Sequence, residues 1–194
     1  MFNTEQINKF LEVIRQIPGI SKKQAEKIVY WILEAEKEQV QQVAQAFIDA
    51  KEKTTFCPIC SQVIENNYCS ICDNSSRDNT LLIVENRQVM QKIEDANIYN
   101  GKYYVFSHLI INEYEEQKYQ KEIQKLLDYA QKFDEIILGI SPSIKGEVTN
   151  EFLKEKLTKQ NLKVTRLAIG LPVGSSVDYI DAITLKFSLI NRQK

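Results

Sequence analysis

Four cysteines, arranged as two Cys-x-x-Cys pairs, constrain this 194-residue chain more than any other feature of its sequence. Cys57 and Cys60 form the first pair, and Cys69 and Cys72 form the second. Each pair can turn the chain back so that both sulfur atoms face one point, and two such turns complete a tetrahedron of thiolates. Protein then fills all four positions and leaves none for water, so the spacing predicts one structural zinc ion (Zn²⁺). Two disulfides, or a single redox-active pair, are the alternatives.

Nothing in the sequence indicates secretion or insertion into a membrane. The first residues, Met1 to Glu5, lack a basic region followed by an apolar one, and no apolar run reaches the roughly 20 residues that a membrane span needs. We therefore expect a cytoplasmic protein, in which reduced cysteines bind metal more often than they form disulfides. The 25 Lys and Arg nearly balance the 26 Asp and Glu, so binding to nucleic acid would require a local basic patch.

Three short helices are predicted within residues 1–50. Apolar residues recur with helical spacing over residues 7–14, 25–32 and 40–47. Ser21 is followed three residues later by Gln24, a capping-box arrangement that predicts the start of the second helix. The first two helices are therefore joined by a tight turn.

That turn, at residues 18–21, is a candidate for contact with nucleic acid. A short turn that ends at a helix N-terminus offers backbone N–H groups and a positive dipole to a phosphate, and lysines beside it add charge. A helical corner with solvated lysines is the alternative, because phosphate contacts leave no sequence signature. The candidate DNA-binding residues are Gly19, Ser21, Lys22, Lys23 and Lys27.

Strands and helices alternate after the cysteines. A continuous apolar run at 81–84 is typical of a strand buried on both faces. This alternation implies an α/β fold with a parallel sheet and helices on both faces. The other predicted strands are 103–106, 136–138 and 162–169, and the predicted helices are a short one at 89–93 and longer ones at 113–132, 146–159 and 177–190.

The candidate catalytic residues are few. Glu85 directly follows the strand at 81–84 and could hold Mg²⁺, but this ion usually needs further carboxylates or phosphates. Glu147 is expected at the start of a helix, where it would stabilise the positive end of the dipole. The single histidine, His108, has no evident Ser or Cys partner, and neither a phosphate-binding P-loop nor a dinucleotide-binding glycine motif is present. We therefore predict no catalytic residue.

The order of these parts resembles the RecR family of bacterial recombination mediators. The resemblance covers nearly the whole chain and is carried by five segments together. The strongest are the two near the C-terminus. The segments are 165–174, 181–185, 141–149, 99–103 and 17–22.

The resemblance implies four parts. They are a helix-hairpin-helix DNA-binding domain at 1–55, a four-cysteine zinc finger at 56–73, a Rossmann-like Toprim domain at 78–170 and a C-terminal helical segment at 171–194. It makes Glu85 the Toprim acidic residue and implies no enzymatic activity. It also implies a homo-oligomer, commonly a tetrameric ring, that encircles single-stranded, double-stranded or gapped DNA. Together with RecO-like and RecF-like partners, such a protein helps to load RecA at single-stranded gaps.

The sequence departs from the family pattern at the hairpin and after the second strand of the α/β part. Ser21 replaces a hairpin glycine, which favours a helix cap but gives a phosphate less room. Residues 107–116 replace a loop rich in Gly and Pro, and Tyr104 stands where the family has histidine. The acidic stretch at 113–116 would repel a phosphate backbone.

Two functions other than a DNA-binding mediator remain open. A magnesium-dependent Toprim enzyme, such as a nuclease or a primase-like phosphoryl-transfer protein, would use Glu85 together with an acidic pair. Gly139 and Ser141 occupy the positions of that pair, which disfavours this alternative. The other is a zinc-bearing interaction module without affinity for DNA.

Overall fold

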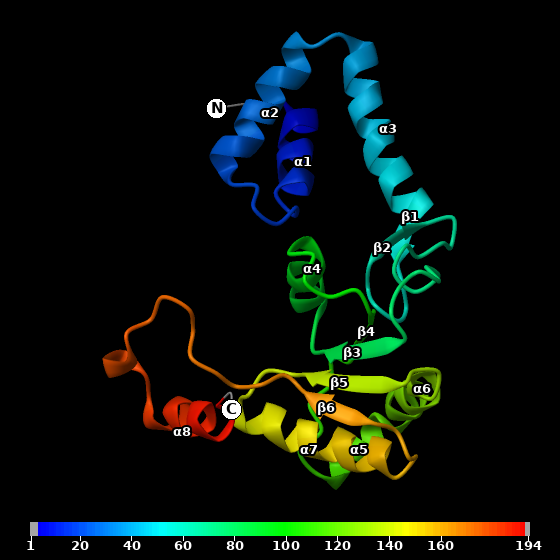
Figure 1. Cartoon of the computed structure of the whole chain (residues 1–194). Helices are drawn as coiled ribbons and strands as arrows, with labels where there is room; N and C mark the ends of the chain where they lie inside the picture. The colour runs from blue at the N-terminus through cyan, green and yellow to red at the C-terminus, as the bar shows by residue number, and fades with distance from the viewer. Residues whose placement is uncertain (1–3, 193–194) are drawn as a thin grey trace. The chain divides into compact units, whose positions relative to one another are not determined.

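The chain forms two compact units, Met1–Thr55 and Phe56–Lys194, in a computed structural model that describes residues 4–192 (Figure 1). Residues 1–3 and 193–194 of the predicted terminal domains lie outside the described part. The predicted domain boundaries stay predictions. Among the described residues, no helix has both the length and the apolar character needed to cross a membrane.

The first unit contains three helices: α1 (Glu5–Ile14), α2 (Lys22–Glu34) and α3 (Lys37–Lys53). The predicted capping box is present, because the Ser21 N–H donates to Gln24 Oε1 at 2.7 Å and the Gln24 N–H donates to Ser21 Oγ at 3.3 Å. Ala25 and Val29 are buried on α2, as the helical spacing predicted. By contrast, α3 buries no residue, and Phe47 is 63% exposed.

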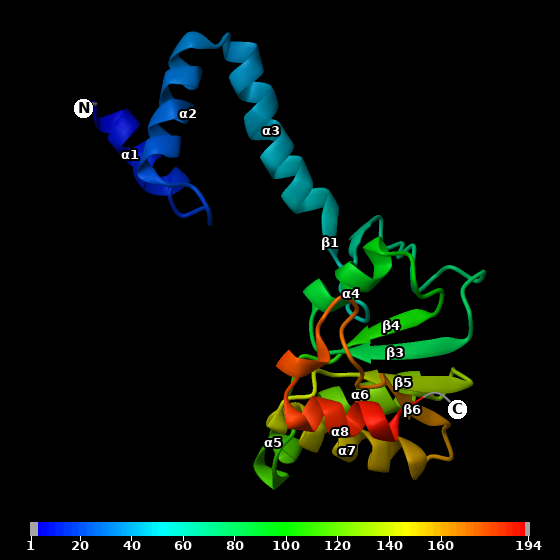
Figure 2. The ribbon, with the colours of Figure 1, turned by 60° about the vertical axis from the view of Figure 1, so that its left-hand side comes forward.

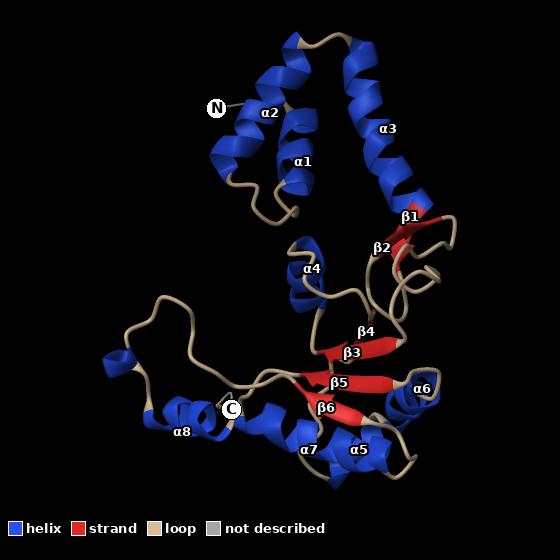
Figure 3. Ribbon diagram, in the orientation of Figure 1, coloured by secondary structure: helices blue, strands red, loops and turns tan. Residues whose placement is uncertain are grey.

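The second unit is built on a four-stranded sheet with the order β4-β3-β5-β6, in which every neighbouring pair is parallel (Figure 3). This confirms the α/β fold with a parallel sheet. The strands are β3 (Thr80–Val84), β4 (Lys102–Val105), β5 (Glu135–Gly139) and β6 (Val164–Arg166). A separate two-stranded sheet pairs β1 (Thr54–Phe56), at the boundary of the two units, with β2 (Val63–Glu65).

The central strand β3 is buried on both faces, and each face packs in a different core. Leu81 and Ile83 pack in a core that α6 (Gln120–Ala130) and α7 (Ile144–Thr158) complete. Leu82 and Val84 point the other way, into a core shared with α4 (Arg87–Asp95) and the cysteine motif. Figures 1 and 3 show α4 above β3 and α7 below β6.

Three predicted elements are divided or shortened in the structure. The helix predicted at 113–132 is two helices, α5 (Glu113–Lys118) and α6, because Tyr119 between them leaves the helical conformation and stacks its ring on His108. The strand predicted at 162–169 is shortened to β6, which lies at one edge of the sheet. The helix predicted at 177–190 is a 3₁₀ turn, η1 (Val177–Tyr179), followed by α8 (Ala182–Ile190).

The divided helix at 177–190 has a clear local cause. Asp181 caps α8, because its carboxylate accepts from the N–H groups of Ile183 and Thr184, and so it fixes a new helix start. On α7, the apolar Val148 is 44% exposed. The buried face of that helix instead includes two polar residues, Thr149 and Asn150, with side chains hydrogen-bonded to the backbone of residues 110 and 140.

The start of α7 provides a test of the packing. An added Cβ on Gly146 would lie 2.0 Å from the Ser141 carbonyl oxygen, so the backbone would have to move. Gly→Ala inside a helix ordinarily stabilises by about 1 kcal/mol. Here we expect Gly146→Ala to destabilise the protein by about 1–3 kcal/mol, as overpacking does. Urea unfolding followed by circular dichroism measures this.

Gly170→Ala is the matched control, because a Cβ there meets nothing within 4 Å. An unfolding midpoint for Gly146→Ala at or above that of the control would contradict the predicted clash.

Candidate metal centre and nucleic-acid interface

The four cysteines converge on one point, as their spacing predicted. Their sulfur atoms all lie within 4.8 Å of one another. Sγ of Cys57 is 3.8 Å from Sγ of Cys72, and Sγ of Cys60 is 3.5 Å from Sγ of Cys69. A tetrahedral zinc ion with bonds of about 2.3 Å to sulfur separates its ligand atoms by about 3.8 Å. The donor set and its spacing therefore fit a tetrahedral metal ion, and all four cysteines are free of disulfides.

Burial and ionisation differ among the four thiols. Cys57, Cys60 and Cys69 are buried, whereas Cys72 is partly exposed. Hydrogen bonding from the Cys60 thiol lowers the pKa of Cys72 to about 6, while the same pairing and burial raise the pKa of Cys60. Because the thiolate is the metal-binding form, the lowered pKa of Cys72 favours binding of a metal ion by this residue.

Local hydrogen bonds hold each pair of cysteines in its turn. The Ser61 N–H donates to the carbonyl oxygen of Cys57 at 3.0 Å, closing the first turn. In the second, the Cys72 N–H points at the sulfur of Cys69 at 3.3 Å, and the Cys69 N–H donates to the carboxylate of Asp73 at 2.7 Å. The sulfur atoms are thus preorganised by the backbone.

The candidate DNA-binding residues lie together around the start of α2. Gly19 has a φ of +90°, a left-handed conformation that favours glycine and lets the chain reverse before the helix. Ser21 is the N-cap, and Lys22, Lys23 and Lys27 are exposed on the first turns of α2. Within residues 4–192, no ion pair joins these lysines to an acidic group, so their charge is available to a phosphate.

Glu85 lies at the carboxyl edge of the sheet, directly after β3. Because β3 and β5 are parallel neighbours with Val84 opposite Gly139, the residues that follow the two strands meet there. The Ser141 hydroxyl donates to Glu85 Oε1 at 2.6 Å. A serine therefore contacts Glu85 where a metal site would place a second carboxylate. In the part of the chain that the structure describes, only the four cysteines form a potential metal-binding cluster.

Two further groups near the sheet have structural partners. Arg166, at the end of β6, donates from its Nη2 to both carboxylate oxygens of Glu147 at 2.7 and 2.9 Å, an ion pair that the sequence did not reveal. His108 stacks on Tyr119 with ring centroids 4.0 Å apart and meets the edge of Phe106. Glu147 thus has a partner beyond the helix dipole, and His108 belongs to an aromatic cluster.

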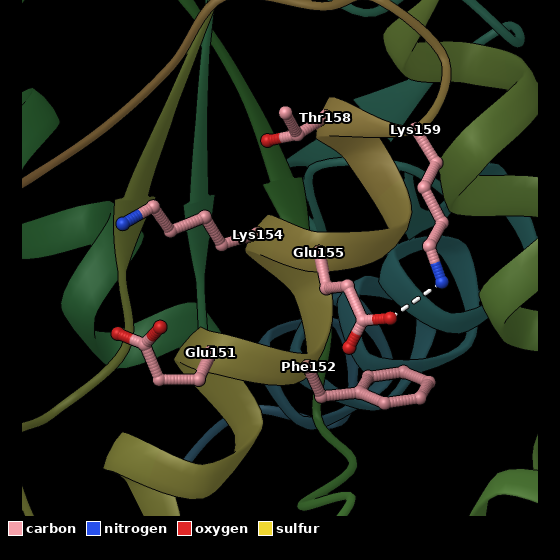
Figure 4. Close-up of a pocket in the computed structure, with 6 residues that line it drawn as sticks. All are labelled: Glu151, Phe152, Lys154, Glu155, Thr158 and Lys159. Atoms are coloured by element: carbon pink, nitrogen blue, oxygen red, sulfur yellow. Dashed lines mark hydrogen bonds and ion pairs between the residues drawn. The ribbon is translucent and has the colours of Figure 1, made fainter.

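A surface hollow lies along α7 (Figure 4). Glu155 and Lys159 pair across it at 2.5 Å, and charges of both signs line it. None of the predicted site residues takes part, so the hollow carries no functional assignment. Its lining consists of Glu151, Phe152, Lys154, Glu155, Thr158 and Lys159.

Family models match three consecutive parts of the chain. The RecR helix-hairpin-helix model matches residues 7–51, the Toprim-domain model matches residues 79–168, and the RecR C-terminal model matches residues 170–193. Together with the four-cysteine cluster, these parts define a Toprim-domain protein of recombinational repair.

Curated relatives named "Recombination protein RecR" agree over nearly the full length. That of Mycoplasmopsis pulmonis is 38% identical over 97% of this chain and 98% of the relative. Those of Bifidobacterium adolescentis and Carboxydothermus hydrogenoformans are 35% and 33% identical, over 96% and 100% of this chain and 95% and 98% of the relatives. The chain belongs to the RecR family of recombination proteins, which confirms the resemblance seen in the sequence and supports a role in recombination repair.

The cysteine cluster predicts a strong dependence on bound metal. Cys57→Ser removes a buried ligand, so we expect loss of stoichiometric metal and a fall in Tm of about 10 °C, because metal binding contributes directly to folding free energy. Elemental analysis and thermal unfolding of the purified full-length variant measure both. Ser70→Ala, an exposed change between the last two cysteines, should match wild type. A Cys57→Ser protein with wild-type Tm would contradict a structural metal.

Proposed function

We propose that this protein is a non-enzymatic, DNA-binding recombination mediator. In this role it forms an oligomeric clamp on single-stranded, double-stranded or gapped DNA in the cytoplasm. With RecO-like and RecF-like partners, it helps to load RecA at single-stranded gaps. The observation that carries the proposal is the helical hairpin, which presents an N-capped helix start beside exposed lysines, in a chain of the RecR family.

The hairpin fits a phosphate backbone in two ways. The N–H groups of Lys22 and Lys23 have no acceptor among the described residues, as expected in the first turn of a helix. They lie at the positive end of the helix dipole. The exposed side chains of Lys22, Lys23 and Lys27 add positive charge to the same turns. These are contacts to phosphate, so they predict binding without a preference for base sequence.

The metal in this proposal is one structural Zn²⁺ held by Cys57, Cys60, Cys69 and Cys72. Thiolate ligands favour zinc over Mg²⁺ or Ca²⁺, and four protein ligands leave no position for substrate. When bound, the ion supplies folding free energy to the segment that covers one face of the sheet. The residues themselves perform no chemistry.

The Toprim carboxylate supports a non-enzymatic role. Phosphoryl transfer with Mg²⁺ needs several carboxylates around the scissile phosphate. Glu85 instead accepts hydrogen bonds from Ser141, and Glu147 is paired with Arg166. A magnesium-dependent nuclease or primase-like enzyme that uses Glu85 is the alternative function.

Self-association is supported by apolar side chains left uncovered after β6. The segment after β6 extends away from the strand before η1 and α8 (Figure 2), and α8 buries none of its residues. Val173 and Tyr179 are fully or nearly fully exposed, and Ile183 is 69% exposed. Apolar surface of this extent is typical of a protein–protein interface. The mass of the protein in solution, with and without gapped DNA, tests this part of the proposal.

Charge reversal at the hairpin tests DNA binding. Lys22→Glu/Lys23→Glu should weaken binding to a gapped duplex at least about tenfold at moderate salt and flatten its salt dependence, because two phosphate contacts are lost. Fluorescence anisotropy across a series of salt concentrations measures this. The matched control is Lys37→Glu/Lys51→Glu, which changes the same charge on exposed residues of α3. Equal binding by the two double variants would show that the hairpin is not the contact.

A nicking assay tests for enzymatic activity. With Mg²⁺ and supercoiled DNA, we expect no cleavage by the wild-type protein above the background of Glu85→Gln, because the second carboxylate is missing. Glu113→Gln, which changes an exposed acid at the start of α5, is the control for lost charge. Cleavage that survives in Glu113→Gln and disappears in Glu85→Gln would establish the enzyme alternative.

A further inference from the structure

The cysteine motif is docked on the edge strand of the large sheet. β4 pairs with β3 on one side only, which leaves its other edge open to the motif. The Val105 N–H donates across that edge to the carbonyl oxygen of Ile59, inside the first Cys-x-x-Cys turn, at 2.9 Å. Ile71, from the second turn, is buried in the same core as Tyr103 of β4. The edge strand therefore contacts both turns of the metal motif.

Lys102, the first residue of β4, makes a direct polar contact with one of the four cysteines. Its ammonium group donates to the carbonyl oxygen of Cys72 at 2.7 Å. The N–H of that same cysteine points at Sγ of Cys69, 3.3 Å away. Cys72 is therefore held at both of its backbone polar groups, one by the neighbouring ligand and one by the sheet. Without Lys102, the carbonyl oxygen of Cys72 would lose this hydrogen bond to the sheet.

The charge balance of the site also involves Lys102. Four thiolates around one Zn²⁺ carry a net charge of −2, and the carboxylate of Asp73, bonded to the Cys69 N–H, adds another negative charge beside them. Lys102 is half-buried, so its positive charge is screened less than that of a surface lysine. Cys72 is also the least buried of the four ligands and so the one that a competing ligand reaches first.

We propose that Lys102 is a positioning residue of the zinc site. It holds the Cys72 peptide so that its sulfur faces the ion, and it offsets the negative charge of the thiolate cluster. Loss of this contact should therefore speed the release of zinc while the sheet remains folded. The inference rests on the proposal that the four cysteines hold zinc, because its readout is the ion itself.

Zinc transfer from the full-length protein to the chromogenic chelator 4-(2-pyridylazo)resorcinol tests the inference. Outer contacts of metal ligands typically change metal affinity by about 10–100-fold, so Lys102→Met should release zinc about tenfold faster than wild type. Lys102→Arg, which keeps the charge and the donor, should recover most of the wild-type rate. Lys163→Met is the matched control, because it removes a lysine paired with Glu135 at 2.7 Å elsewhere on the same sheet.

Two further measurements separate positioning from general stability. Thermal unfolding of the zinc-free proteins should give the same Tm for Lys102→Met as for wild type, and Lys102→Gln serves in its place if the Met variant aggregates. Three results would each overturn the inference. The neutral variants Lys102→Met and Lys102→Gln could release zinc at the wild-type rate, or Lys102→Arg could release it as fast as they do. The third is a Tm of the zinc-free neutral variant that falls as far below wild type as the Tm of its zinc-bound form. Elemental analysis of the purified wild-type protein comes first. If it finds no bound zinc, the zinc assignment itself is overturned.

Discussion

The buried central strand β3 fixes the positions of the other parts of the second unit. Its side chains alternate between two cores, so Leu81 and Ile83 require α6 and α7 on one face, while Leu82 and Val84 require α4 and the cysteine motif on the other. Its parallel register with β5 also brings together the residues that follow the two strands. At this carboxyl edge of the sheet, the Glu85 carboxylate accepts a hydrogen bond from the hydroxyl of Ser141. The strand β3 thereby provides one face for the cysteine motif to pack on and places Glu85 beside Ser141.

The metal motif and the sheet depend on each other. A segment of 18 residues (56–73) is too short to bury a core of its own, so its fold depends on docking against β4 and, in the proposed function, on the bound metal. In return, the motif covers the apolar face of Leu82, Val84 and Tyr103, which would otherwise meet water. The cysteine motif therefore contributes to the core on this face of the sheet.

Local signals were strong enough to predict several elements correctly. The Ser21–Gln24 capping box, the continuous apolar run at 81–84 and the two Cys-x-x-Cys pairs each depend on residues close together in sequence. Two features that the sequence did not reveal depended on residues outside the element concerned. The break at Tyr119 is stabilised by His108, and the polar inner face of α7 is stabilised by backbone atoms of Ile110 and Ile140.

The sequence by itself determined the four-cysteine motif, the hairpin and the alternation of strands and helices, because spacing and periodicity express them directly, and five of its segments resembled the RecR family. Only the tertiary structure decided which groups meet: Ser141 with Glu85, Arg166 with Glu147, and Lys102 with Cys72. These partners are 19 to 56 residues apart in the chain. Sequence spacing carries no information about such pairs, since the register of a parallel sheet and the docking of a motif on its edge bring them together.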